Sequence, residues 1–238
     1  MKFIYLLVVL CTLCQTCFAA TEQYYSSCEE AKLRKSGVQT IKLGNDTLEV
    51  FCETPRIGKS GWMVIQRRVS AEENFYRNWA TYENGFGDIY KNYFIGLKKL
   101  HQITGLKPYE LYIYLENFKG ESRYAYYGTF SIGDRNTKYQ LTIESYSGNA
   151  GDALTKKHNK MKFSTYDNDN DKSKSNCAAK YTGAWWYNKC YDSTLNGAYL
   201  GDGKHSGEYL IGSGIVWWKW NDDVYSLKKV EMMIRPKW

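Results

Sequence analysis

Residues 166–197 read YDNDNDKSKSNCAAKYTGAWWYNKCYDSTLNG, and the rest of the chain is interpreted from this stretch outward. Asp167, Asp169 and Asp171 alternate with polar or aromatic neighbours, so oxygen donors cluster where no aliphatic residue can bury them. A hard divalent cation suits such a loop, because it takes about six to eight oxygen ligands and accepts backbone carbonyls. The acidic end of the stretch therefore predicts a metal site, with a solvated acidic loop as the alternative.

The second half of the stretch holds an aromatic cluster between two cysteines. Cys177 and Cys190 bracket the cluster, which consists of Tyr181, Trp185, Trp186 and Tyr187. A turn rich in Gly and Asn follows at residues 195–197. A disulfide between these two cysteines would hold the aromatic loop in one shape.

The first twenty residues have the pattern of a secretory signal peptide. Lys2 precedes an almost wholly apolar run at residues 3–13, and the small residues Ala19 and Ala20 precede a polar segment. The apolar run is too short to span a bilayer, so an N-terminal membrane anchor is the weaker alternative. We expect residues 1–20 to be removed, and the mature protein to be secreted, extracellular and not embedded in a membrane.

Removal of residues 1–20 leaves an even number of cysteines. Of the 7 cysteines in the sequence, Cys11, Cys14 and Cys17 leave with the leader. The four that stay are Cys28, Cys52, Cys177 and Cys190. Four cysteines allow about three connectivities in a secreted chain, and proximity in sequence favours the first with the second and the third with the fourth.

Charge and composition exclude some partners. The chain has 32 Lys and Arg against 25 Asp and Glu, a net charge of +7 that becomes +6 without Lys2. This excess would attract anionic glycans or cell surfaces, or would only keep the surface soluble. The basic residues form no concentrated stripe, so nucleic acid is not an expected partner.

Apolar periodicity predicts an α+β fold. Strands are expected at residues 38–41, 48–52, 61–68, 111–115, 124–132, 139–143 and 225–234. Helical spacing predicts one helix ending at Gly85 and another ending at Gly105. A capping box formed by Ser27 and Glu30 predicts a short additional helix up to Arg34.

Three local features accompany these elements. Asn45 begins the sequence Asn-Asp-Thr between the first two strands, and we predict N-glycosylation there. The last strand changes phase at Lys228 and Lys229, where a bulge would explain the slip. Periodicity fails from residue 147 to about residue 214, and the Trp and Tyr content of this region predicts ordered functional loops.

Twelve short motifs, in order along the chain, match one family. They are SCEEA (27–31), GW (61–62), VIQRR (64–68), FYRNW (75–79), GFGD (85–88), GNAGD (148–152), FST (163–165), NCA (176–178), WW (185–186), LNG (195–197), YSLK (225–228) and IRP (234–236). On these motifs residues 21–238 resemble the fibrinogen-related, or fibrinogen C-terminal, domain found in fibrinogen and in secreted lectins such as tachylectins and ficolins. No collagen-like or coiled-coil segment precedes the motifs, so the likeness is to lectins built from this domain alone.

The resemblance implies a fold and a disulfide pattern. The family has a small N-terminal subdomain, a central antiparallel sheet flanked by helices, and a loop-rich C-terminal subdomain that holds calcium and ligand. Its disulfides correspond to Cys28–Cys52 and Cys177–Cys190 in this chain.

The resemblance also implies a calcium site. The family pattern puts carboxylate ligands at Asp169 and Asp171, and backbone carbonyl ligands at Ser173 and Ser175. The loop is not an EF-hand, because the Gly and Glu that such a loop needs are replaced by Lys172 and Ala178.

The family ligand pocket lies beside the calcium loop and takes acetylated groups. Tyr181 matches an aromatic wall, and Lys189, Cys190 and Tyr191 match the segment that offers backbone donors and commonly contains a cis peptide. Tyr191 stands where the family has His, which keeps a flat ring but removes a titratable nitrogen. Two sets of rings remain to be assigned. Tyr209, Trp217 and Trp218 would complete the walls, whereas core packing is the alternative for Trp185, Trp186, Trp217 and Trp220.

Enzymatic motifs are missing from the sequence. His101, His158 and His205 fall in no nucleophile elbow or zinc motif, and a fully oxidised mature chain has no cysteine nucleophile. We therefore expect no enzyme, with a calcium-dependent hydrolase that uses Asp167 as its base as the alternative.

The expected function is that of a secreted, calcium-supported lectin for acetylated glycans such as N-acetyl sugars on microbial or cell surfaces, acting in innate immune recognition. A homo-oligomer would add avidity. The alternative is a protein-interaction module, a receptor ligand or coagulation effector, whose pocket takes a peptide end or an acidic group.

Overall fold

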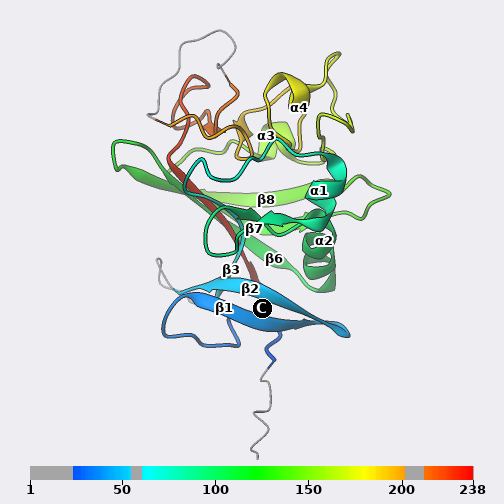
Figure 1. The fold of residues 1–238 in the computed structure, drawn as a ribbon, viewed down its shortest axis with the longest axis vertical. Helices are drawn as coiled ribbons and strands as arrows, with labels where there is room; N and C mark the ends of the chain where they lie inside the picture. Colours follow the sequence, from blue (N-terminus) through cyan, green and yellow to red (C-terminus); the bar gives the residue numbers. More distant parts are fainter. Residues whose placement is uncertain (1–23, 55–60, 202–211, 238) are drawn as a thin grey trace, which may run out of the picture.

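The computed structural model describes residues 24–54, 61–201 and 212–237. A sheet of nine strands crosses the molecule, and its main path has the order β1-β2-β3-β11-β6-β7-β8 (Figure 1). Its strands are β1 (Gly37–Leu43), β2 (Asp46–Glu53), β3 (Trp62–Arg68), β4 (Phe86–Gly87), β5 (Tyr93–Phe94), β6 (Tyr109–Glu116), β7 (Ser122–Ile132), β8 (Leu141–Gly148) and β11 (Lys229–Pro236). All of these pairs are antiparallel, which confirms the α+β class.

The strand β11 lies in the middle of the sheet between β3 and β6, and nearly all of its residues are buried. Its register against β3 shifts between Met232 and Met233. The bulge predicted at Lys228 and Lys229 is therefore wrong in position, because the neighbouring strands set the register and β11 begins only at Lys229.

Four helices are described: α1 (Trp79–Asn84), α2 (Leu97–Leu106), α3 (Thr155–His158) and α4 (Cys177–Lys180). The helix α2 packs on β7 and buries Leu97, Leu100 and Ile103, which are spaced as on one face of a helix. It passes through Gly105 and ends one residue later than expected. The helix α1 begins at Trp79, where the Asn78 side chain accepts the Thr81 N–H and caps the first turn.

The short helix predicted for residues 27–34 does not form. Ser27 Oγ accepts the Glu30 N–H at 3.3 Å, as in a capping box, but the Glu30 carboxylate accepts the N–H of Ser26 instead of closing the box. Lys32 then takes a left-handed conformation with φ 46°, which interrupts a right-handed helix. The segment forms turns, tied to β2 by the Cys28–Cys52 disulfide.

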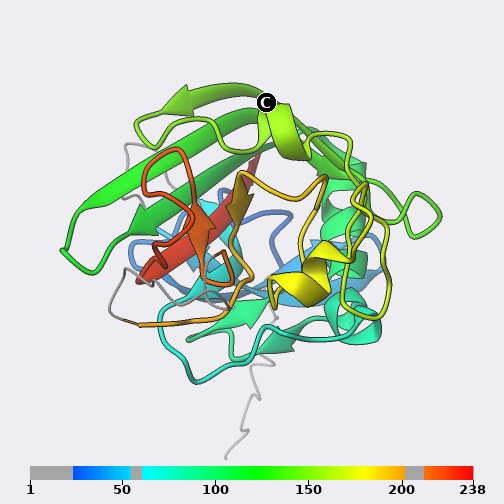
Figure 2. The ribbon, with the colours of Figure 1, turned by 90° about the horizontal axis from the view of Figure 1, so that it is seen from above.

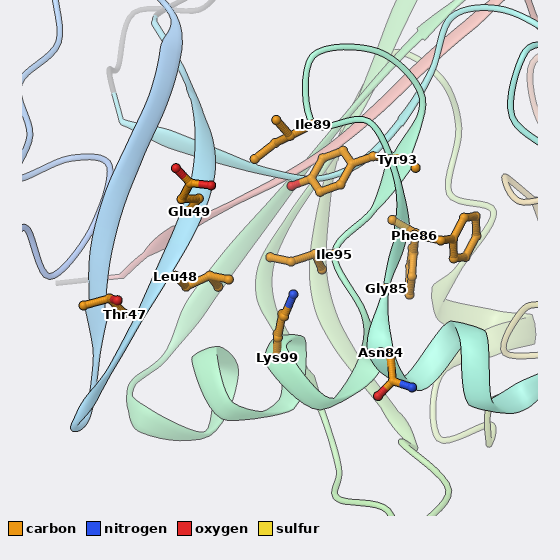
Figure 3. Close-up of a pocket in the computed structure, with 12 residues that line it drawn as sticks. Thr47, Leu48, Glu49, Asn84, Gly85, Phe86, Ile89, Tyr93, Ile95 and Lys99 are labelled. Atoms are coloured by element: carbon orange, nitrogen blue, oxygen red, sulfur yellow. The ribbon is translucent and has the colours of Figure 1, made fainter.

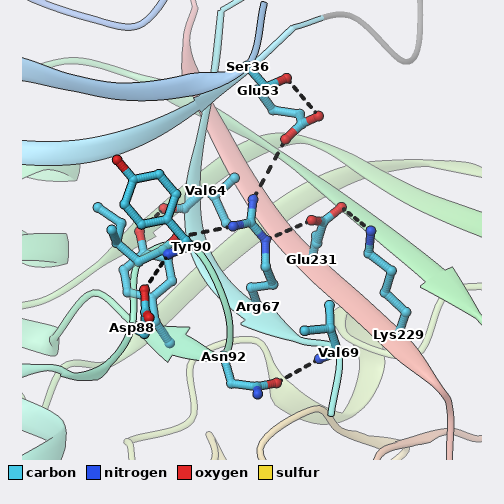
Figure 4. Close-up of polar contacts among 12 residues, drawn as sticks. Ser36, Glu53, Val64, Arg67, Val69, Asp88, Tyr90, Asn92, Lys229 and Glu231 are labelled. Carbon is cyan, nitrogen blue, oxygen red and sulfur yellow. Dashed lines mark hydrogen bonds and ion pairs between the residues drawn. The ribbon is translucent and has the colours of Figure 1, made fainter.

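The β1–β2 hairpin forms a small N-terminal unit at one end of the sheet (Figure 1). Asn45 is exposed in its turn, next to Gly44 at φ 66°, and its glycosylation stays a prediction. Arg67 joins this unit to the central strand: Nε donates to Glu231 Oε1 at 2.8 Å and Nη2 lies 3.7 Å from Glu53 Oε2 (Figure 4). Arg67 Nη1 also donates to the Ile89 carbonyl oxygen at 3.1 Å.

Loops and short elements cover the opposite end of the sheet (Figures 1 and 2). They include α3, α4 and a two-stranded sheet of β9 (Ser193–Thr194) and β10 (Val216–Trp217). Trp185 and Trp186 are fully buried among these loops. Two side chains of β3 join the loops to the sheet, because Gln66 donates to the Leu195 carbonyl oxygen at 2.9 Å and Arg68 donates to that of Gly197 at 2.7 Å. Within the described ranges, no helix has the length and hydropathy to cross a membrane.

Candidate functional site

The disulfide between Cys177 and Cys190 ties together two segments of the loop-rich end. The Cα atoms are 5.8 Å apart, and the pairing agrees with the sequence prediction. Cys177 begins α4, where Asn176 caps the helix by accepting the Ala179 N–H at 2.9 Å. The bond therefore holds the end of α4 against the segment that carries Tyr191.

A hollow of about 150 Å³ lies beside this disulfide, and we call it the aromatic hollow. It is lined by Tyr181, Cys190, Tyr191, Trp218 and Asp223. The rings of Tyr181 and Tyr191 meet edge to face with centroids 4.9 Å apart. The predicted pocket residues Tyr181, Cys190 and Tyr191 are thus brought together.

Gly212 closes one side of the two tyrosine rings. Its φ is 78°, and a Cβ atom at this position would come within 1.9 Å of the Tyr191 hydroxyl oxygen. Its N–H donates to the Asp223 carbonyl oxygen at 2.9 Å. Glycine is required both by the left-handed backbone and by this close approach. Burial raises the pKa of Tyr191, so its phenol stays neutral at physiological pH.

The segment before Tyr191 contributes Cys190 to the lining of the hollow. The Lys189–Cys190 peptide is cis, and the Lys189 side chain is exposed. The Asn188 N–H donates to the Cys190 carbonyl oxygen at 2.7 Å. The N–H groups of Cys190 and Tyr191 donate to no residue that the structure describes. Within the described part of the chain, these two N–H groups are candidate donors for a ligand.

One predicted wall residue differs from its expected place. Trp217 does not line the aromatic hollow: it is fully buried, and its indole N–H donates to the carbonyl oxygens of Ala150 and Gly151 at 3.2 and 3.0 Å. Its neighbour Trp218, 51% exposed, provides the wall. Tyr209 lies outside the described residues. Asp223 was not foreseen, because no motif marks a carboxylate so far along the chain.

The acidic loop, residues 167–175, packs against the start of α4. Asp171 accepts the N–H of Ser173 at 2.7 Å and that of Cys177 at 2.8 Å, and Asp169 accepts the N–H of Asp171 at 3.1 Å. Partial burial raises the pKa of Asp171, and the neighbouring Asp169 carboxylate adds to the rise. The two carboxylates are therefore close enough to repel each other, and a cation between them would relieve this repulsion.

The donor set of this loop fits a hard cation only with help from the backbone. In the described part of the chain, no group of three or more His, Cys, Asp or Glu side chains could hold a metal ion. Ser173 and Ser175 follow the carboxylates in sequence and contribute carbonyl oxygens of the kind that calcium accepts. Two carboxylates, carbonyls and water would then form the shell.

Asp167 has a different role in the loop. Its Oδ1 atom accepts the Trp79 N–H at 2.9 Å and the Thr165 hydroxyl at 2.7 Å. The carboxylate thus joins the loop to the start of α1. Sequence reasoning counted Asp167 with the other acidic residues and missed this contact, since Trp79 is far away in the chain.

His158 is a further residue that sequence reasoning did not assign. It is fully buried, with Nδ1 2.8 Å from the Trp186 carbonyl oxygen. Its Nε2 accepts the N–H groups of Asp192 and Ser193 at 3.0 and 3.2 Å, so the imidazole is neutral with its proton on Nδ1. Burial lowers the pKa of His158 to about 4. The ring fixes the backbone that directly follows Tyr191.

Comparison with known proteins agrees with this architecture. Residues 24–237 match the family model described as the C-terminal globular domain of fibrinogen beta and gamma chains. The chain belongs to the fibrinogen C-terminal domain family.

Relatives in this family come from several kinds of protein. This fibrinogen C-terminal domain is 42% identical over 231 residues to chicken (Gallus gallus) tenascin, an alignment that takes in 93% of this chain but 12% of tenascin. It is also 42% identical over 235 residues to bovine (Bos taurus) fibrinogen-like protein 1, covering 90% of this chain and 73% of that protein.

Solved structures of the family have the same fold. The fibrinogen-like globe domain of human ANGPTL2 superposes with a TM-score of 0.85 at 37% identity, over 89% of this chain and 99% of that one. The lamprey fibrin D-dimer, in complex with the peptide Gly-His-Arg-Pro-amide, superposes with a TM-score of 0.82 at 31% identity, over 93% and 79% of the two chains.

Proposed function

We propose that this domain is a secreted recognition module whose aromatic hollow captures an acetyl group carried by a glycan. The observation that carries the proposal is the pair of backbone N–H groups, those of Cys190 and Tyr191, that donate to no described residue and lie beside the rings of Tyr181 and Trp218. The acetyl methyl would lie against the rings, and the acetyl oxygen would accept from the backbone. The function is binding, without a catalytic step.

The size of the hollow supports a small terminal group as the ligand. Ligand pockets commonly enclose about 300–1,000 Å³, whereas this hollow has about 150 Å³. An acetyl group would therefore enter the hollow while its sugar ring stays at the mouth, against Trp218. Such a site would accept many N-acetylated glycans, as surveillance of microbial surfaces in innate immunity requires.

Calcium is proposed as the ion of the acidic loop. The carboxylates of Asp169 and Asp171 would neutralise it, and the carbonyl oxygens of Ser173 and Ser175, with water, would complete the shell. The loop is joined to the walls of the hollow, because Asp171 accepts the Cys177 N–H and the Lys172 N–H donates to the Asn188 carbonyl oxygen at 3.0 Å. Ion binding would therefore stiffen the hollow, and sugar binding would depend on it.

Secretion is proposed on two supports. Residues 1–20 have the signal-peptide pattern. The described chain also holds two disulfides, which persist in oxidising compartments.

A column carrying N-acetylglucosamine tests this function. The secreted protein should be retained with calcium and eluted by free N-acetylglucosamine or by a chelator. Tyr181→Ala should lose retention, whereas Tyr90→Ala, which removes an exposed ring far from the hollow, should keep it. Retention that is equal for both variants would rule out the aromatic hollow as the sugar site.

A second candidate is favoured by Asp223. A carboxylate in the wall of a small hollow suits a cationic peptide end better than a neutral acetyl group. The related lamprey fibrin D-dimer was solved with the peptide Gly-His-Arg-Pro-amide. Titration with this peptide distinguishes the two functions: Asp223→Asn should abolish peptide binding and leave N-acetylglucosamine binding unchanged if both ligands use the hollow as described.

A further inference from the structure

Among the strands that the structure describes, none lies beside one edge of the first half of β2. The side to which its backbone groups point follows from the hydrogen bonds of β1. The Tyr25 N–H donates to the Thr40 carbonyl oxygen, and the Lys42 N–H donates to the Tyr25 carbonyl oxygen. The backbone groups of Thr40 and Lys42 therefore point away from β2. Because N–H and C=O groups alternate sides along an antiparallel strand, Ile41 points its groups toward β2, where it pairs with Leu48.

The same alternation determines the direction of the backbone N–H and C=O groups of Thr47 and Glu49. Their neighbour Leu48 uses its backbone groups on β1, so the N–H and C=O groups of Thr47 and Glu49 point to the opposite side. Neither residue forms a backbone hydrogen bond on that side with any described part of the chain. Two donors and two acceptors along one short edge therefore have no backbone partner among the described residues.

The free edge exists because β3 leaves β2 early. The strand β2 pairs with β3 only from Phe51 to Glu53, and β3 continues beside β5 through Gln66 and Arg67. Between these two pairings Ile65 has no partner of its own on β11, since Met232 pairs with Gln66 and Met233 with Val64. Such a bulge bends a strand, so β2 and β5 diverge along the same side of β3.

A groove of about 550 Å³ fills the space where these strands diverge, and we call it the edge groove (Figure 3). Leu48 lies on one wall, and Ile89, Tyr93 and Ile95 lie on the other. Glu49 and Lys99 supply one charge of each sign at its rim. The volume lies within the range of ligand-binding pockets, about 300–1,000 Å³.

We propose that the edge groove binds an extended peptide segment of a partner protein, which adds a strand to β2. The peptide backbone would pair with the free groups of Thr47 and Glu49, and alternate side chains would enter the apolar space between Leu48 and Ile95. A basic residue in the peptide would match Glu49. A sugar would use the rim charges but not the regular spacing of backbone donors and acceptors, so the edge favours a peptide. This site is separate from the aromatic hollow and independent of its function.

A synthetic hexapeptide tests the proposal on the intact protein. The probe is acetylated and amidated, with one lysine followed by alternating valine and threonine, so that valines meet the apolar wall and the lysine meets Glu49. Two further probes carry N-methyl groups, one on the valine amides and the other on the threonine amides. Because successive amides point to opposite sides of a strand, only one N-methylated probe loses the donors that face β2. We expect that probe to bind at least about tenfold more weakly and the other to bind like the parent.

Hydrogen exchange locates the bound strand. In the free protein the amides of Thr47 and Glu49 should exchange fast, and those of Leu48 and Val50 slowly. The parent peptide should protect Thr47 and Glu49 without changing Leu48. Glu49→Pro removes one free N–H at an edge that tolerates proline, and it should abolish binding, whereas Glu49→Gln keeps the donor and should retain it within about threefold.

Several outcomes would overturn the proposal. Equal affinity of the two N-methylated probes would mean that backbone pairing is not used. Protection at β8, the far edge of the sheet, instead of at Thr47 and Glu49 would mean non-specific strand pairing. A concentration-dependent dimer that Glu49→Pro dissolves would show that a second copy of the chain occupies the edge. The N-methyl comparison uses the unmodified protein, so it decides even if the proline variant does not fold.

Discussion

Trp217 and Trp218 are neighbours in the chain and lie in opposite environments. Trp217 is in β10 and is fully buried, with its indole N–H bonded to two carbonyl oxygens, whereas Trp218 stands half exposed at the aromatic hollow. Successive side chains of an extended segment point to opposite sides, so only one of two adjacent tryptophans can face the hollow. The sequence does not tell which, because the register of β10 is set by β9.

Alanine substitution should separate the roles of the two tryptophans. We expect Trp218→Ala to change the free energy of unfolding by less than about 0.5 kcal/mol and to weaken N-acetylglucosamine binding about tenfold. Trp217→Ala should lower the free energy of unfolding by about 3–5 kcal/mol, because it leaves a large cavity. Urea unfolding and sugar titration of both variants provide the measurements. Equal destabilisation by the two substitutions would contradict the assignment.

His158 should make the stability of the domain depend on pH. Its pKa is about 4 in the folded protein and 6.5 ordinarily, so between these values the unfolded chain takes up a proton that the folded chain does not. The stabilisation is fully present above pH 6.5 and is lost as the pH falls toward 4. From pH 6.5 to pH 5 the expected loss is about 2 kcal/mol. Urea unfolding at pH 7 and pH 5 measures it, with His158→Gln as the variant that should lack this part of the pH dependence. An unchanged slope in the variant would assign the effect to other groups.

At the scale of elements, local pattern predicts the central strands and α2 well. The alternation of apolar residues in β6 and the helical spacing of Leu97, Leu100 and Ile103 depend only on which face is buried. The residue types in each segment identify that face. The errors arise where distant partners decide. Segment 27–34 follows its disulfide to β2 instead of its capping box, and the bulge of the last strand pair lies where β3 requires it.

The candidate site was predicted only in part for the same reason. Tyr181, Cys190 and Tyr191 lie close in sequence to the disulfide, and motif matching located them. The residues that hold these three in place lie far from them in sequence. His158 lies 34 residues from Asp192, and Gln66 and Arg68 reach the 195–197 turn from β3. Such contacts depend on how the strands and loops are arranged in space, and the sequence of the loop alone does not predict that arrangement.

The buried charge cluster around Arg67 connects β2, β3 and β11, and it should be essential to their packing. Arg67→Met would leave Glu231, 2% exposed, without its closest cation, and we expect the free energy of unfolding to fall by about 3–5 kcal/mol. Arg77→Met removes an exposed ion pair with Glu73 and should change it by less than about 1 kcal/mol. Urea unfolding compares the two. If the double substitution Arg67→Met with Glu231→Met is no more stable than Arg67→Met alone, the loss of Arg67 beside the Glu231 carboxylate is not the cause.

At the scale of the whole molecule, the sheet separates the two proposed binding sites. The aromatic hollow and the acidic loop lie in the loop-rich end, whereas the edge groove lies beside the N-terminal hairpin (Figures 1 and 3). A ligand at one surface therefore leaves the other accessible. A domain of this design could hold a glycan and a peptide segment at the same time.

Calcium should stabilise the whole domain if the acidic loop binds it. At a calcium concentration about 100 times its dissociation constant, the free energy of unfolding should rise by about 2.7 kcal/mol. Thermal unfolding with calcium and with a chelator measures the difference. Asp169→Asn should reduce the calcium effect, whereas Asp88→Asn, whose carboxylate accepts the nearby Tyr90 N–H, should keep it. A melting temperature that does not respond to calcium would contradict the metal assignment.

The position of β11 has a consequence for biosynthesis. Its partners β3 and β6 are translated long before it, and each must wait with an open hydrogen-bonding side until Val230 and the residues around it emerge from the ribosome. During that interval the nascent chain exposes two unpaired strand edges, which can pair with other chains. The yield of folded protein should therefore depend on chaperone supply more than on the final stability of the domain, and premature stop codons before residue 229 should yield aggregates instead of a smaller folded product.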